Sequence, residues 1–175
     1  MTRSELEHLI RASGAIADDD ELIIIGSQSI LAQFPEAPAT LRVSMETDLY
    51  PRNKPELADL VDGSIGEGSY FHEQFGYYAQ GVGPETAILP AGWEKRLARI
   101  ENKNTNGIAG LCLDVHDMAI SKYVAGRPKD REFTRELAQQ TMTKHQTLKQ
   151  RLNATDIPSE ERIRINSIID VDFQA

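Results

Sequence analysis

The sequence predicts an α+β fold in which the strands come early in the chain and the helices late. Three observations predict it. The β-branched run of residues 22–25 stops at a glycine, as a strand buried on both faces does. Short apolar segments bounded by glycine and proline continue to residue 113, and from His116 onward the apolar residues recur at helical spacing. We expect one domain over 1–175, with a mainly sheet-containing core over 1–115 and a helical C-terminal part over 116–175.

The elements of the first half follow from periodicity and from punctuation by glycine and proline. Apolar residues three or four positions apart predict helices, and runs of β-branched or alternating residues predict strands. The expected elements are a helix over 4–12, a strand over 22–25, a helix over 27–32, a strand over 47–52 and a helix over 55–62.

Glycine and aromatic residues alternate between positions 63 and 92, which favours short strands joined by turns. Later segments have the longer apolar period of helices. We expect strands over 77–79, 86–89, 97–100 and 108–113, and helices over 118–125, after Pro128, over 143–152 and over 159–170.

Composition excludes several classes of protein. The chain has 175 residues, of which 40% are apolar and 26% charged, and these fractions are typical of globular domains rather than of disordered or collagenous chains. Its one cysteine, Cys112, cannot form an internal disulfide. The N-terminus lacks a basic start followed by an apolar run, and no stretch of about 18 apolar residues occurs. We therefore expect a cytoplasmic protein with no membrane partner.

The net charge of −8 is unevenly distributed. It is −10 over residues 1–92, +5 over 93–151 and −3 over 152–175. Acidic metal ligands facing a basic, phosphate-binding segment would produce this asymmetry, and so would ordinary variation of a solvated surface. Both interpretations stay open.

Gly26 and Ser27 lie between the buried strand and the helix that follows it. Backbone N–H groups and the helix dipole at such a place favour an anion such as phosphate, and a glycine lets the anion approach closely. The alternative is ordinary turn and N-cap chemistry.

Glu46 and Asp48 are separated by one residue at the start of the second expected strand. Side chains two positions apart project from the same face of a strand, so the two carboxylates could bind one hard cation or bridge two. Without a cation such a pair repels, which favours the metal interpretation. The alternative is a pair of exposed acids at a strand edge.

A third set of polar residues lies on the helix expected near His116. Lys122 would lie within this helix, where its ammonium group could extend toward a phosphate at the Gly26–Ser27 loop. Arg127 and Lys129 add positive charge nearby. The alternative is a surface helix with scattered cations.

Together these residues resemble the nucleotidyltransferase superfamily, whose signature is a Gly-Ser helix opening followed by a strand with an acid-x-acid pair. Within it, the chain resembles most the bacterial group typified by the AbiEii toxins of abortive-infection systems and its uncharacterised relatives. The segments concerned are IGSQSIL at 25–31, SMETDLYP at 44–51 and DMAISKYVAGRPKD at 117–130, and the resemblance spans roughly residues 20 to 137.

The resemblance implies a nucleotidyltransferase-like mixed sheet flanked by helices, with roles for seven residues. It implies nucleotide binding by Gly26, Ser27, Lys122 and Arg127, binding of Mg²⁺ or Mn²⁺ by Glu46 and Asp48, and catalytic roles for Glu46, Asp48, Lys122 and Asp130.

Two departures from the family pattern leave two functions open. The first acid is usually aspartate and here is Glu46, and a third acid has no clear match among Glu73, Glu85 and Asp114. The first hypothesis is a Mg²⁺-dependent enzyme that transfers a nucleotidyl group from a nucleoside triphosphate to an acceptor, either RNA such as tRNA or a protein. It could be a toxin paired with an antitoxin protein. The alternative is a catalytically degenerate module that binds a nucleotide or a protein.

Overall fold

The computed structural model describes residues 1–174, and the chain divides into two compact units. The first unit comprises residues 1–86 and 97–113, and the second comprises residues 87–96 and the chain from Asp114 onward. The single domain expected over 1–175 stays a prediction.

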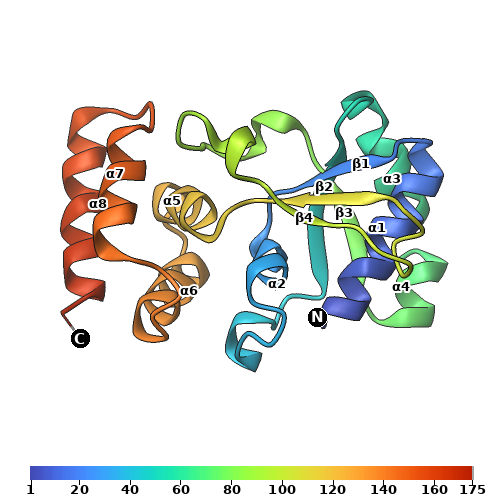
Figure 1. Cartoon of the computed structure of the whole chain (residues 1–175), viewed down its shortest axis with the longest axis horizontal. Coiled ribbons are helices and arrows are strands. Elements are labelled where there is room, and N and C mark those ends of the chain that lie inside the picture. Colours follow the sequence, from blue (N-terminus) through green and yellow to red (C-terminus); the bar gives the residue numbers. More distant parts are fainter. Residues whose placement is uncertain (175) are drawn as a thin grey trace. The chain divides into compact units, whose positions relative to one another are not determined.

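The first unit is built on a five-stranded mixed sheet with the order β3-β2-β1-β5-β4 (Figure 1). Strand β1 pairs antiparallel with β2 and parallel with β5, while β2–β3 is parallel and β4–β5 antiparallel. This sheet confirms the predicted α+β class. The strands are β1 Glu21–Ile24, β2 Glu46–Pro51, β3 Tyr78–Gly81, β4 Ala98–Ile100 and β5 Ala109–Cys112.

Two helices cover the same face of this sheet, α1 (Arg3–Ala17) and α3 (Ala58–Ile65). A Cβ atom on Gly110 of β5 would lie 2.3 Å from Cδ1 of Ile10 in α1, and one on Gly81 of β3 would lie 1.9 Å from the carbonyl oxygen of Ala58 in α3. Strand register places Gly110 and Gly81 on one face with Leu49. The opposite face therefore carries the alternate residues of β2, including Glu46 and Asp48.

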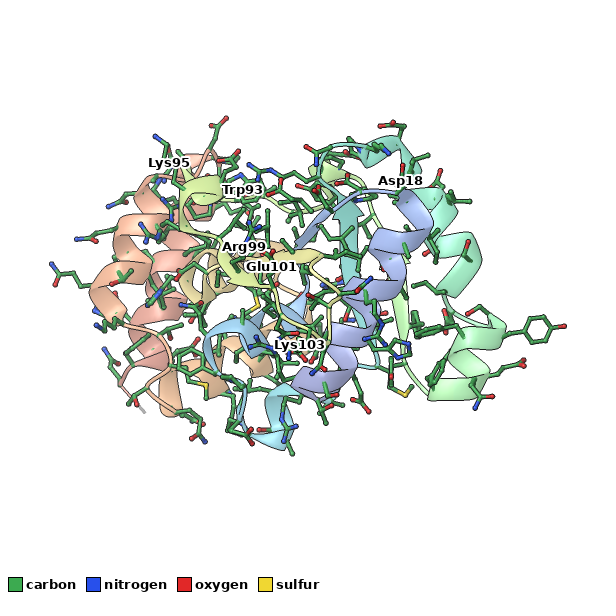
Figure 2. All side chains as sticks on the ribbon, turned by 45° about the vertical axis from the view of Figure 1, so that its right-hand side comes forward. Asp18, Trp93, Lys95, Arg99, Glu101 and Lys103 are labelled. Carbon is green, nitrogen blue, oxygen red and sulfur yellow. The ribbon has the colours of Figure 1, made fainter. Side chains whose placement is uncertain are left out.

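Helix α1 is longer than the expected 4–12. Thr2 caps it, because the Thr2 side chain accepts from the Glu5 backbone N–H while the Glu5 carboxylate accepts from the Thr2 N–H. The helix ends at Ala17, and Asp18 (labelled in Figure 2) follows it in a left-handed conformation. At the β4 edge, Nε of Arg99 donates to Glu101 at 2.6 Å (Figure 2), and charged side chains of this kind protect a sheet edge against further pairing.

The segment between α3 and β4 differs most from expectation. A helix that was not expected, α4 (Tyr70–Phe75), begins where the Ser69 hydroxyl accepts from the His72 N–H and ends at the left-handed Gly76. The strand expected over 86–89 is wrong. Thr86 belongs to a 3-10 turn over Pro84–Thr86. Pro90, which ends the segment, has no backbone N–H to donate to a neighbouring strand.

The remaining elements of the first unit are short. They are 3-10 turns at Ser27–Ser29, Ala39–Leu41 and Pro55–Leu57, and helix α2 at Ile30–Gln33.

The second unit is helical. Asp114 caps its first helix and the left-handed Gly126 ends that helix, while Pro128 begins the next one. The Ala91 N–H donates to the Ala154 carbonyl at 2.9 Å, which fixes the 87–96 segment to the end of α7. The elements are a 3-10 turn at Trp93–Arg96 and helices α5 Val115–Ala125, α6 Pro128–Gln139, α7 His145–Asn153 and α8 Ser159–Asp172 (Figure 1).

Across residues 1–174, no helix combines the length and the apolar character that crossing a membrane requires.

We predict that Gly81→Ala lowers the free energy of unfolding by about 2 to 3 kcal/mol, because the new methyl group would overlap the backbone carbonyl of Ala58 and force α3 away from β3. Urea denaturation measures the change. Gly63→Ala is the matched control, since a Cβ there meets nothing within 4 Å and alanine favours the helix by about 1 kcal/mol. Equal stability of the two variants would contradict the predicted packing.

Candidate functional site

Glu46 and Asp48 lie on one face of β2, as their spacing predicts. Both side chains are partly exposed. Thr47, which lies between them in the strand, and Leu49, which follows Asp48, are fully buried. Thr47 and Leu49 point toward the α1 side of the sheet. Because side chains alternate along a strand, their burial places Glu46 and Asp48 on the opposite face. The strand therefore presents two carboxylates toward the face opposite α1 and α3.

Gly26 lies directly beneath the Asp48 side chain. A Cβ atom on Gly26 would be 2.6 Å from Oδ2 of Asp48 and 3.2 Å from its Cγ. The Ile25 N–H donates to the Asp48 carbonyl at 3.0 Å and extends the pairing of β1 with β2 to this point. The φ of Gly26 is −79°, which any residue can adopt, so the glycine is needed because a side chain here would collide with Asp48 and not because of its backbone conformation. The loop and the second acid, which are 22 residues apart in sequence, are thus brought together.

Ser27 begins the turn that follows Gly26. The Ser29 hydroxyl donates to the Ile24 carbonyl at 2.8 Å and ties this turn to the end of β1. The helical segment here is a three-residue 3-10 turn followed by the four-residue α2, so the helix dipole is weaker than the sequence suggested. Phosphate binding would depend on the Ser27 side chain and on the first N–H groups of the turn, which lack partners within it.

The Tyr78 hydroxyl donates to Oε2 of Glu46 at 3.1 Å. The two residues are register partners in the parallel pair β2–β3, which places their side chains on the same face. Burial and the Glu46 carboxylate raise the pKa of Tyr78 to about 12, so the phenol keeps its proton at neutral pH. Sequence analysis did not find this contact, because the register of β3 against β2 depends on packing far along the chain.

In the second unit, Asp130 holds two cations. Arg127 donates from Nε to Oδ2 at 2.6 Å and from Nη2 to Oδ1 at 3.2 Å, while Nζ of Lys122 lies 3.3 Å from Oδ1. The Lys122 ammonium also lies 4.8 Å from the centre of the Phe133 ring, which favours a cation. The structure therefore brings together the three residues expected from the C-terminal motif.

The Asp130 side chain is only 1% exposed, and both of its oxygens contact cations. Burial alone would raise the pKa of Asp130, but Arg127 and Lys122 outweigh this effect and lower it. This geometry suits a residue that orients Lys122 and Arg127 more than one that itself contacts a substrate. Its position in the first turn of α6 adds a favourable interaction with the helix dipole.

Two further buried carboxylates organise the second unit. Asp117 is fully buried and accepts from Arg96 at 2.7 and 2.9 Å, with Arg151 Nε at 3.2 Å. Asp172 accepts from the Tyr123 hydroxyl at 2.9 Å. Sequence analysis did not assign these pairs, because a buried acid and an exposed acid have the same sequence signature.

The two carboxylates on β2, those of Glu46 and Asp48, could bind a divalent cation whose remaining ligands come from a substrate phosphate and water. No group of three or more histidine, cysteine, aspartate or glutamate residues in the described part of the chain could hold a metal ion. Mg²⁺ typically takes one or two carboxylates and completes its shell with water and substrate phosphates. Glu46 and Asp48 could supply those carboxylates, whereas Asp114, a candidate third acid, accepts from the His116 N–H as the cap of α5.

The charge asymmetry follows the two units. The first has seven basic and sixteen acidic residues, and the second has twelve basic and eleven acidic ones. The basic stretch at 93–151 therefore belongs mainly to a unit whose basic and acidic residues are nearly equal in number. Several of its cations pair with buried carboxylates.

We predict that Asp130→Asn lowers the free energy of unfolding at pH 7 by about 2 kcal/mol, because Lys122 and Arg127 lose their shared counter-charge. The folded pKa of Asp130 lies below its ordinary value of 3.8, so its ionic stabilisation is complete above that value and disappears as the pH falls through the folded pKa. The difference between wild type and variant should therefore stay constant down to about pH 4 and shrink as the pH falls further, toward and through the folded pKa of Asp130.

Urea denaturation across this pH range measures the difference. Asp156→Asn removes an exposed carboxylate from the same unit and is the control, with an expected change below about 0.5 kcal/mol. A difference for Asp130→Asn that stays constant with pH would contradict the ionic role.

Comparison with known proteins identifies the family. The family described as a nucleotidyltransferase of unknown function, DUF6036, matches residues 4–174. No curated protein and no solved structure matches the chain. The mixed sheet flanked by helices is consistent with a nucleotidyltransferase-like fold. Because the match covers nearly the whole chain, the protein belongs to the DUF6036 family of nucleotidyltransferases.

Proposed function

We propose that this protein binds a nucleoside triphosphate together with Mg²⁺ or Mn²⁺ and transfers its nucleotidyl group to an acceptor. One observation carries the proposal: the Asp48 carboxylate lies over Gly26, so that an acid pair suited to a metal and a loop suited to a phosphate meet where β1 ends and β2 begins. Family membership supports the reaction class, and the geometry supports these residues within it.

Each of the residues at the end of β1 and the start of β2 would have a separate role in the reaction. Glu46 and Asp48 would hold the divalent cation, and Ser27 would contact the triphosphate. When bound, the cation would offset the charge that develops as the bond between the α-phosphorus and the pyrophosphate breaks. Gly26 leaves room for Asp48, whose carboxylate any larger residue would displace. Such fixed positions would reduce reorganisation during the reaction.

We assign Lys122 and Arg127 to the triphosphate by the resemblance of their segment to the family motif. The ion pairs with Asp130 support this role, because they hold both cations in defined orientations. Positive charge at a phosphoryl-transfer centre stabilises the leaving pyrophosphate. Asp130 would act through these cations.

The proposed acceptor is RNA, and the biological role is that of a toxin controlled by an antitoxin protein. The second unit supports an RNA acceptor only modestly, since many of its cations are neutralised internally. Binding to RNA through phosphates should weaken steeply as salt is added. A protein acceptor would show a much shallower dependence, because it releases no condensed counterions, so the slope of the salt series distinguishes the two.

We predict that wild-type protein binds Mn²⁺ and a non-hydrolysable nucleoside triphosphate, and that Asp48→Asn weakens this binding at least about tenfold, because it removes a charged metal ligand. Gly26→Ala should have a similar effect without changing stability by more than about 1 kcal/mol, since the closest atom to its methyl group, at 2.6 Å, is Oδ2 at the end of the Asp48 side chain. Calorimetry with the four ribonucleotide analogues measures both.

Asp59→Asn is the control for these variants. It removes a charge from an exposed position on α3, which covers the opposite face of the sheet, and should leave binding unchanged. Absence of binding by wild-type protein with all four analogues would refute the proposal, and equal losses in Asp59→Asn would refute the assigned site.

We predict turnover in a cell extract supplied with labelled nucleoside triphosphate. Label should enter a macromolecule, and pyrophosphate should appear. Lys122→Met should reduce the labelling and the pyrophosphate release at least about tenfold, because the negative charge on the leaving pyrophosphate is no longer offset. The two-acid ligand set and the glutamate at position 46 favour the alternative of a binding module. Nucleotide binding without any label transfer or pyrophosphate would support that module over the enzyme.

A further inference from the structure

Glu46 is held at both its side chain and its main chain, unlike an exposed acid at a strand edge. The Tyr78 hydroxyl donates to one of its oxygens, Oε2, at 3.1 Å. The Ser44 hydroxyl lies 3.2 Å from both the N–H and the carbonyl oxygen of Glu46 and fixes the backbone there. The side chain and the main chain of this one residue are therefore both constrained.

Tyr78 is itself held in place. Its side chain is 9% exposed, and the His72 ring of α4 packs against the phenol with 4.6 Å between ring centres. The His72 Nδ1 accepts from the Gly68 N–H at 3.0 Å, which fixes the orientation of the imidazole. A rigid donor of this kind can restrict a flexible acceptor at little further entropic cost.

The need for such a donor follows from the length of glutamate. Glu46 carries one methylene more than the aspartate usual at this position in the superfamily, so its carboxylate has an additional rotatable bond and more conformations to lose when it binds a cation. A hydrogen bond to Oε2 removes much of this freedom in advance and leaves Oε1 available. Tyr77, the preceding residue, cannot contribute, because its hydroxyl lies 2.8 Å from Nδ1 of His8 in α1, on the other side of the strand.

We infer that Tyr78 is a positioning residue that orients the Glu46 carboxylate for a divalent cation and so compensates for the longer side chain at this position. This inference rests on the proposed function, because it assigns Glu46 as a metal ligand.

The test is a double-mutant cycle on the full-length chain, with Mn²⁺ affinity measured by calorimetry in the presence of α,β-methylene ATP. Tyr78→Phe should weaken Mn²⁺ binding about tenfold to a hundredfold, the usual range for loss of a hydrogen bond to a metal ligand. Tyr77→Phe removes an equivalent hydroxyl from the same region and should change affinity less than about twofold, because that hydroxyl contacts His8.

The decisive arm uses Glu46→Asp. The shorter aspartate ends about one bond length farther from the phenol, beyond hydrogen-bonding distance, so Tyr78→Phe should change Mn²⁺ affinity less than about twofold in this background. A general structural role of Tyr78 would instead lower affinity equally in both backgrounds. Thermal unfolding of all variants shows whether each one is folded under the conditions of the titration.

Each outcome separates the inference from the proposed function. Strong loss in the wild-type background and none in the Glu46→Asp background supports the positioning role. Equal Mn²⁺ affinity of wild type and Tyr78→Phe, or equal losses in both backgrounds, overturns the inference while the proposed metal site stands. Failure of the wild type to bind Mn²⁺ overturns both.

Discussion

The candidate site depends on the close antiparallel pairing of β1 with β2. This pairing brings Asp48 so close to Gly26 that a Cβ atom on Gly26 would lie 2.6 Å from Oδ2 of Asp48. Burial of Thr47 and Leu49 against the α1 side keeps the strand from slipping by one residue, which would turn both acids into the core. The polar site is therefore fixed by the apolar packing on the far side of the same strand.

Buried acids have a comparable organising role in the helical unit. Asp117 and Asp130 each lie in the first turn of a helix and each hold a pair of cations. A buried carboxylate is tolerated only when its charge is offset, so each ion cluster specifies one arrangement of neighbouring helices. Lys122 and Arg127 thus owe their orientation to Asp130, and chemistry that used them would depend on this support.

Sequence reasoning predicted those features that depend on local patterns. The shared face of Glu46 and Asp48 follows from the two-residue period of a strand, and the C-terminal helices follow from their apolar spacing and from Pro128. It could not predict the pairing of Glu46 with Tyr78, because strand order and register are set by contacts between distant segments. The strand expected over 86–89 was wrong because a short apolar run bounded by glycine and proline does not distinguish a strand from successive turns.

The central claim is that the Glu46–Asp48 face and the Gly26–Ser27 loop form one metal and nucleotide site. Paramagnetic broadening by substoichiometric Mn²⁺, recorded on amide resonances of ¹⁵N-labelled protein with a non-hydrolysable triphosphate, tests it most directly. The account predicts selective loss of the signals of Gly26, Ser27, Asp48 and Tyr78, and recovery of these signals in Asp48→Asn. Broadening centred elsewhere, or unchanged in that variant, would contradict it.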